Sequence, residues 1–169
     1  MSINLFFIAL LGLLIGMYNY FTPNYTPSND VGEIPKIELF GFTLYEISHK
    51  GIDHILEGKE GKKFDESYTV TSAKFSDNTK TLFQTIKSDN VDYRSDLIKL
   101  KGNVHYARED GLEFRSNEGQ YNTDTSVIQT EGGFVITQKS NRIDGKKLHY
   151  NNENDTVSAD NVRVSYQLK

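Results

Sequence analysis

The sequence predicts an all-β domain of stacked antiparallel hairpins, preceded by one N-terminal membrane-spanning helix. Three observations lead to this fold class: an uncharged apolar run near the start, a short stretch holding all three prolines, and a long remainder in which apolar and polar residues alternate. The chain has 169 residues, which is enough for one domain of ordinary size. We therefore expect a single folded unit behind a short N-terminal appendage.

The membrane helix is predicted over residues 3–21, where the sequence INLFFIALLGLLIGMYNYF contains no charged residue. A run of about 20 apolar residues is long enough to cross a bilayer. A cleaved signal peptide is the alternative, but no small-residue cleavage site ends the run. Tyr18, Tyr20 and Phe21 fit an aromatic belt at the membrane surface. We expect an uncleaved anchor that holds the domain outside the cytoplasm.

Within this run, Gly12 and Gly16 form a GxxxG pattern, which lets a second helix approach closely. Glycine is also common in membrane helices without any packing role. Gly12 and Gly16 are therefore candidate helix-packing residues, and both interpretations stay open.

A linker is predicted over residues 22–36, because Pro23, Pro27 and Pro35 all fall there among Ser, Asn and Asp. The folded domain should then span residues 37–169. In that range Gly, Asn and Asp separate short runs of β-branched and aromatic residues, as is typical of successive strands. The one ambiguous segment is Gly51–Phe64, which could begin a short helix, although we expect strands there too.

The alternation is clearest around Gly102, where apolar residues share one parity and polar residues the other. The apolar set is Ile98, Leu100, Val104 and Tyr106, and the polar set is Lys99, Lys101, Asn103 and His105. This pattern predicts strands with one buried and one solvated face.

A repeat strengthens the prediction of stacked hairpins. Tyr93, Tyr121 and Tyr150 are spaced about 28 residues apart, and each is followed by a polar turn and a second strand. The turns RSD, NTDT and NNEND are polar and mostly built from Asn and Asp, which tolerate left-handed backbone. Hairpins of this kind cannot bury their apolar faces alone, so they should pile into an extended β stack or an open sandwich.

Several function classes are disfavoured. The net charge of −4 comes from mixed acids and bases, so no basic face for nucleic acid is expected. The chain has no cysteine, and its four histidines are scattered without metal-ligand spacing. No catalytic motif and no phosphate-binding glycine loop is present. We expect a binding protein that is not an enzyme and that has no metal and no cofactor.

The segment KLKGNVHY, the repeated S-x-x-x-x-Y unit with its polar turn and the terminal NVRVSYQLK resemble the OstA-like periplasmic proteins. With the N-terminal anchor, the chain resembles the LptC family of lipopolysaccharide export proteins within that group. The resemblance implies a twisted open β-jellyroll in the periplasm, behind a single-pass anchor in the bacterial inner membrane. It also implies lipopolysaccharide as ligand, the inner-membrane ABC transporter subunits as partners, and relay of glycolipid towards the outer membrane.

Acyl chains could be held by a row of apolar side chains, since each buried methylene contributes about 0.8 kcal/mol. Parity selects the candidates, although a core residue has the same signature as a lipid-lining one. The candidate lipid-binding residues are Phe42, Leu44, Phe75, Ile86, Ile98, Leu100, Val104, Tyr106, Phe114, Phe134, Ile136, Leu148, Val162, Val164 and Tyr166.

The final strand, Val162 to Leu168, has a single charged residue, Arg163, and no proline, so its edge could receive a strand from another chain. We expect a periplasmic OstA-like bridge protein to add its strand there. The candidate partner-binding residues are Gly102, Gly145, Val162, Val164, Tyr166 and Leu168. The two glycines could equally serve a bulge or a turn.

Two other functions remain to be compared with this one. A membrane-anchored adhesin or glycan-binding β-domain would show aromatic platforms on its outer face and would bind no lipid inside. A sugar-active enzyme on a short β-helix would need acids and bases clustered on one exposed sheet face.

Overall fold

The computed structural model describes residues 34–151, 153–154 and 156–167. These residues form one antiparallel sheet of nine strands, and every strand pairs with its neighbours in sequence. The strands are β1 (Ile37–Ser48), β2 (Gly51–Lys63), β3 (Ser67–Asp77), β4 (Gln84–Arg94), β5 (Leu97–Arg108), β6 (Leu112–Asn122), β7 (Val127–Gln138), β8 (Asn141–Asn151) and β9 (Thr156–Ser165). The prediction of an all-β fold built from antiparallel hairpins is confirmed, and the ambiguous segment forms strand β2.

The predicted membrane helix at residues 3–21, with Gly12 and Gly16, lies outside the described residues, as does most of the predicted linker. Within the described part of the chain, no helix is long and apolar enough to cross a membrane.

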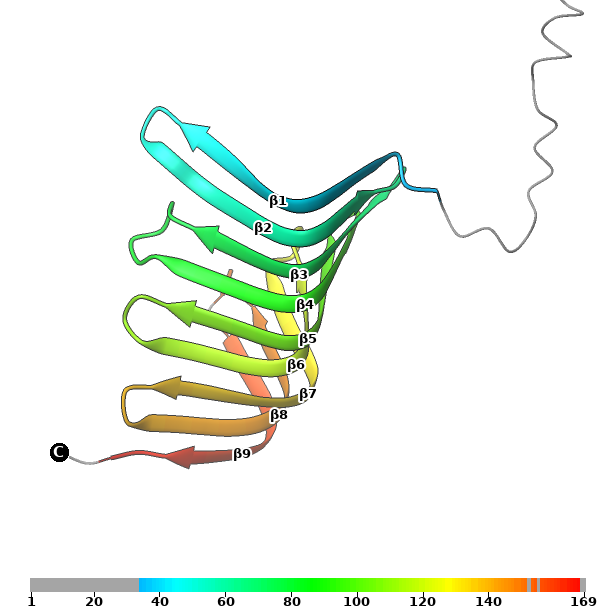
Figure 1. Cartoon of the computed structure of the whole chain (residues 1–169). Helices are drawn as coiled ribbons and strands as arrows, with labels where there is room; N and C mark the ends of the chain where they lie inside the picture. Colours follow the sequence, from blue (N-terminus) through cyan, green and yellow to red (C-terminus); the bar gives the residue numbers. More distant parts are fainter. Residues whose placement is uncertain (1–33, 152, 155, 168–169) are drawn as a thin grey trace, which may run out of the picture. The chain divides into compact units, whose positions relative to one another are not determined.

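Each strand bends near its middle, so that the sheet has two arms that meet along the bend (Figure 1). The bend coincides with residues of positive φ inside strands, such as Gly41, Ser72 and Asn103, and with shifts of register between neighbouring strands. An extra residue of this kind is a β-bulge, which bends a strand and breaks its pairing locally. The first arm ends at the turn after β1 and the second arm at the turn after β2.

One face of the sheet carries the buried hydrophobic residues, and we call it the inner face. Among the described hydrophobic residues, those that are buried are Ala73, Val104, Phe134 and Leu148. Buried polar side chains at the bend are satisfied: Ser88 donates to the carbonyl oxygen of Asn90 at 2.7 Å. The domain therefore has a thin core along its bend, and much apolar surface on its arms stays open to solvent.

The bulges also switch the parity of the inner residues along a strand. In β3, Val70 and Phe75 both lie on the inner face, because Ser72 adds one residue between them. In β5 two residues, Gly102 and Asn103, have positive φ. The inner residues before and after them therefore have the same parity. The alternation that the sequence shows around Gly102 is therefore preserved in the structure, whereas other strands change parity at the bend.

Candidate functional site

An uninterrupted row of apolar side chains crosses the inner face of the first arm. Cross-strand partners share a face of the sheet, and the pairings follow one another across all nine described strands. We call it the apolar row: Leu44, Leu56, Phe75, Ile86, Tyr106, Phe114, Ile136, Ile143 and Val164.

The apolar row is only partly covered. Phe75 is 37% exposed, and the row is more open at its two ends, with Leu44 at 49% and Val164 at 62%. Contiguous exposed apolar surface marks a binding site more often than scattered exposed residues do. The row is thus an apolar strip that the domain itself leaves without a partner.

Closer to the bend, aromatic rings pack over glycines. A Cβ on Gly145 would lie 2.6 Å from the Phe134 ring, and one on Gly58 would lie 2.7 Å from both the Phe42 ring and Val70. Phe134 also stacks on Phe114 of the apolar row, with ring centroids 6.2 Å apart. Gly145, predicted as a partner-binding residue, therefore has a steric role in the described structure, because only glycine leaves room for the Phe134 ring.

A second row lies on the inner face near the free end of the second arm. Each of its members is the cross-strand partner of the next, from β2 to β9. We call it the tyrosine row: Lys63, Tyr68, Tyr93, Ile98, Tyr121, Ile128, Tyr150 and Val157. The three tyrosines of the sequence repeat belong to it. Tyr68 and Tyr93 stack with centroids 6.0 Å apart, yet remain 44% and 36% exposed.

The free end of the first arm carries polar residues instead, on the same face as the apolar row. His54 lies 2.8 Å from Glu46 and 3.4 Å from Asp77. Gln84 donates to Asp77 at 3.1 Å and accepts from the Tyr106 hydroxyl at 2.6 Å. We call Glu46, His54, Asp77, Gln84, Arg108 and Gln138 the polar row, and it ends the apolar surface of this arm.

Two carboxylates at this end are held in their charged form. Burial tends to raise the pKa of Asp77, but hydrogen bonds from Thr79 and Gln84 outweigh it and the pKa lies below its ordinary value. The hydrogen-bonded Arg108 guanidinium lowers the pKa of Asp110 from 3.8 to about 2. Gln138 also donates to Asp110, at 3.1 Å. The polar row is therefore a hydrogen-bonded network, and Arg108 compensates the charge of the neighbouring Asp110.

Most predicted lipid-binding residues lie on the inner face. Seven belong to the apolar row, Ile98 belongs to the tyrosine row, and Phe42, Phe134 and Val104 lie near the bend. Leu100 pairs with Val91 and Leu148 with Thr130. Val162 and Val164 lie in β9, at 49% and 62% exposure. Inner-face residues outside the predicted set are Leu56, Ile143, Tyr68, Val70, Val91, Tyr93, Tyr121 and Tyr150. In β3, β4 and β6 the parity of the inner residues changes at the bulges. Tyr150, in contrast, has the same parity as the predicted Leu148.

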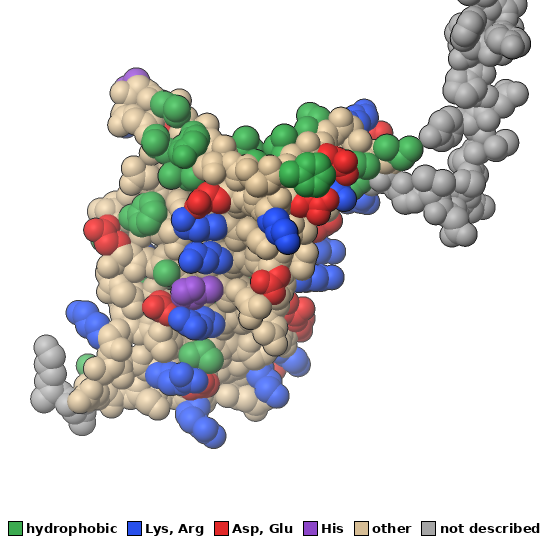
Figure 2. All heavy atoms as spheres, viewed as in Figure 1, with side chains coloured by type: hydrophobic (Ala, Val, Ile, Leu, Met, Phe, Trp, Pro, Cys, Tyr) green, Lys and Arg blue, Asp and Glu red, His purple; other side chains and the backbone are tan. Residues whose placement is uncertain are grey.

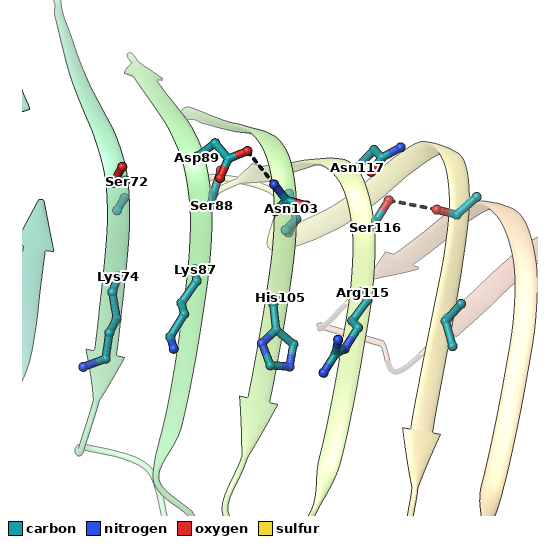
Figure 3. Close-up of a pocket in the computed structure, with 14 residues that line it drawn as sticks. Ser72, Lys74, Lys87, Ser88, Asp89, Asn103, His105, Arg115, Ser116 and Asn117 are labelled. Carbon is teal, nitrogen blue, oxygen red and sulfur yellow. Dashed lines mark hydrogen bonds between the residues drawn. The ribbon is translucent and has the colours of Figure 1, made fainter. Parts of the chain in front are cut away.

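The outer face is charged. A column of basic side chains crosses the front of the molecule in Figure 2, and in Figure 3 Lys74, Lys87, His105 and Arg115 lie side by side on neighbouring strands. They border a hollow of about 780 Å³ that Asp89 and Asn103 also line. Lys74 pairs with Glu57 at 2.5 Å and Arg115 with Glu113 at 2.9 Å. This hollow is polar and its charges are largely paired, so the apolar inner face remains the better candidate for a lipid.

Strands β1 and β9 are the two edges of the described sheet. The final strand was predicted to reach Leu168, but β9 ends at Ser165. Tyr166 lies beyond the strand and is 69% exposed. Leu168 is outside the described residues. Gly102 has a φ of +78° in the bend of β5, far from either edge. Its conformation explains the glycine without any partner.

The histidines do not gather, and no group of acidic residues and histidines in the described part of the chain could hold a metal ion. His105 lies 3.2 Å from Glu113 on the outer face, whereas His54 stacks on Phe75 at 5.3 Å on the inner face. His54 had no predicted role.

The sequence matches the family described as lipopolysaccharide-assembly, LptC-related, over residues 7–167. The chain belongs to this family. LptC-related proteins serve lipopolysaccharide transport, so the chain is a transport protein and not an enzyme. No curated protein matches the sequence.

The fold has a counterpart among solved structures. LptH from Pseudomonas aeruginosa, described as the LptA homologous periplasmic component of the conserved lipopolysaccharide transport device, matches with a TM-score of 0.51 and 10% identity. The match covers 78% of this chain and 94% of LptH. At this identity the likeness establishes the fold, and it places the LptC-related chain on an LptA-like scaffold.

Proposed function

We propose that this chain binds lipopolysaccharide on the inner face of its bent sheet and relays it from the inner-membrane ABC transporter to a periplasmic bridge protein. The observation that carries the proposal is the apolar row, which crosses all nine described strands without a polar interruption and is left partly exposed. A surface of this kind continues across the whole sheet, from one edge strand to the other, so a lipid could move along it.

Burial of acyl chains supplies the binding energy in this proposal. Each methylene removed from water contributes about 0.8 kcal/mol, so a few methylenes per chain suffice for useful affinity. The two arms of the sheet would act as the walls of an open jellyroll. No covalent chemistry is required of the chain, and the energy for export would come from the transporter's ATPase.

The anchor and the edges complete the proposal. Residues 3–21 would hold the chain in the inner membrane beside the transporter subunits, with Gly12 and Gly16 as the packing surface and residues 22–36 as the linker. The domain would then lie in the periplasm. The β9 edge, with Val162, Val164 and Tyr166, would receive a strand of the OstA-like bridge protein.

The test compares two neighbouring residues of β4. Ile86 belongs to the apolar row and Lys87 faces outward beside the hollow. Ile86→Glu should reduce the amount of lipopolysaccharide that co-purifies with the full chain at least ten-fold, because a carboxylate on the acyl surface is costly to desolvate. Lys87→Glu should leave it unchanged. Val104 is a poorer probe, since it is only 2% exposed and its replacement would disturb the core.

Equal retention of lipid by the Ile86→Glu and wild-type chains, with both folded by circular dichroism, would contradict the proposal. The adhesin or glycan-binding function would then become the better explanation, and binding of soluble polysaccharide without lipid would support it.

A further inference from the structure

The two ends of the inner face differ in a way that bears on how a glycolipid would be oriented. At the free end of the first arm, the polar row is joined by hydrogen bonds: Asp77 accepts from Thr79 at 2.6 Å and from Gln84 at 3.1 Å, and Arg108 donates to Asp110 at 2.9 Å. Donors and acceptors that already serve one another are costly to separate and offer little to a ligand.

The tyrosine row at the free end of the second arm is different. The hydroxyl groups of Tyr68, Tyr93 and Tyr121 make no hydrogen bond to any described residue. Their rings are partly covered: Tyr68 stacks on Tyr93 at 6.0 Å, and the Lys63 ammonium lies 5.4 Å from the Tyr68 ring centroid. Lys63 itself forms no ion pair within the described part of the chain.

This combination is suited to a molecule that is apolar at one end and polar at the other. Tyrosine presents an apolar ring and a polar hydroxyl, which favours boundaries between apolar and aqueous surroundings. A sugar ring has an aliphatic face that stacks on aromatic rings and hydroxyl groups that pair with phenols. Lys63, the first member of the row, has no carboxylate partner among the described residues and adds a cation for a phosphate group.

We propose that the tyrosine row holds the phosphorylated sugar headgroup of the glycolipid, while the acyl chains lie along the bend and the apolar row. This inference rests on the proposed function, and it assigns the headgroup to the second arm. The hydrogen-bonded polar row of the first arm then marks where the acyl surface ends. This arrangement gives the sequence repeat a function, because each repeat contributes one tyrosine (Tyr93, Tyr121 or Tyr150) to the tyrosine row.

The test uses the full chain, purified in a mild detergent, and two labelled probes: lipid A, which carries a phosphorylated sugar headgroup, and a free fatty acid of matched acyl length. The variant Tyr93→Phe/Tyr121→Phe keeps both rings and removes two hydroxyls. It should weaken lipid A binding about ten-fold and leave fatty acid binding unchanged. Lys63→Gln should weaken binding of lipid A but not of its dephosphorylated form, and Lys87→Gln on the outer face is the matched control.

The outcomes separate the two proposals. Equal losses for lipid A and the fatty acid, or no loss for either, would overturn the headgroup assignment while leaving lipid binding in place. A wild-type chain that binds the fatty acid but shows no preference for lipid A would also overturn it. A folded wild-type chain that binds neither probe would overturn the proposed function and this inference together.

Discussion

At the scale of single residues, glycines and aromatic rings define the inner face near the bend. The Phe134 ring lies against Gly145, and the Phe42 ring lies against Gly58 and Gly61. The sequence showed Gly145 only as a glycine that could serve a turn or a partner. The ring above it lies on the neighbouring strand, so nothing in the local sequence could indicate the contact.

Replacing Gly145 by alanine should destabilise the domain by about 1–3 kcal/mol, because the new Cβ would lie 2.6 Å from the Phe134 ring. Gly133→Ala is the matched control, since its Cβ would meet its nearest neighbour at 3.9 Å. Denaturant unfolding of both variants checks this. Equal stability of the two variants would contradict the packing described here.

The Asp77 carboxylate predicts a dependence of stability on pH. Its pKa in the folded chain lies below the ordinary 3.8, so its contribution to the unfolding free energy is fully present above about pH 4. That contribution is lost as the pH falls through the folded pKa. Denaturant unfolding from about pH 6 to about pH 2 should show a smaller loss of stability for Asp77→Asn than for the wild type. Parallel curves for the two chains would refute this role of Asp77.

At the scale of elements, the sequence predicted strands, hairpins and turns well, because alternation and polar turns are local signals. It predicted the inner residues of β5 because the parity is the same on both sides of Gly102 and Asn103. In β3 it selected Phe75 but no inner residue before Ser72, because nothing about a serine in the sequence indicates the positive φ that Ser72 adopts. The tyrosines of the tyrosine row are not among the predicted lipid-binding residues, although the spacing of Tyr93, Tyr121 and Tyr150 marks them as a sequence repeat.

The edge strand β9 is where we predict that the partner protein binds. Deleting Val162–Lys169 should abolish binding of the periplasmic bridge protein and spare lipid binding, because the apolar row loses only its terminal member. The chain has no cysteine, so single cysteines can report the edge directly. Arg163→Cys in β9 should cross-link to the bridge protein, whereas Thr43→Cys in β1 should not. The reverse pattern would assign the partner to β1.

At the scale of the whole molecule, the domain combines a thin core with a broad apolar inner face. Only four described hydrophobic residues are buried, and no large side chain in the described part of the chain is completely enclosed. Such a sheet keeps stable backbone pairing along every strand while leaving its inner surface available. Membership of the LptC-related family and the LptA-like fold agree with a role in lipopolysaccharide assembly.

The most direct test of lipid binding on the inner face is site-specific photo-crosslinking in a lipopolysaccharide-producing bacterium. A photoreactive amino acid would replace Ile86 or Phe75 on the apolar row, and Lys87 or Lys74 on the outer face, one position at a time in the full chain. Lipopolysaccharide adducts at Ile86 and Phe75, and none at Lys87 and Lys74, are the result we predict. Adducts confined to the outer positions, or equal at all four, would contradict the account.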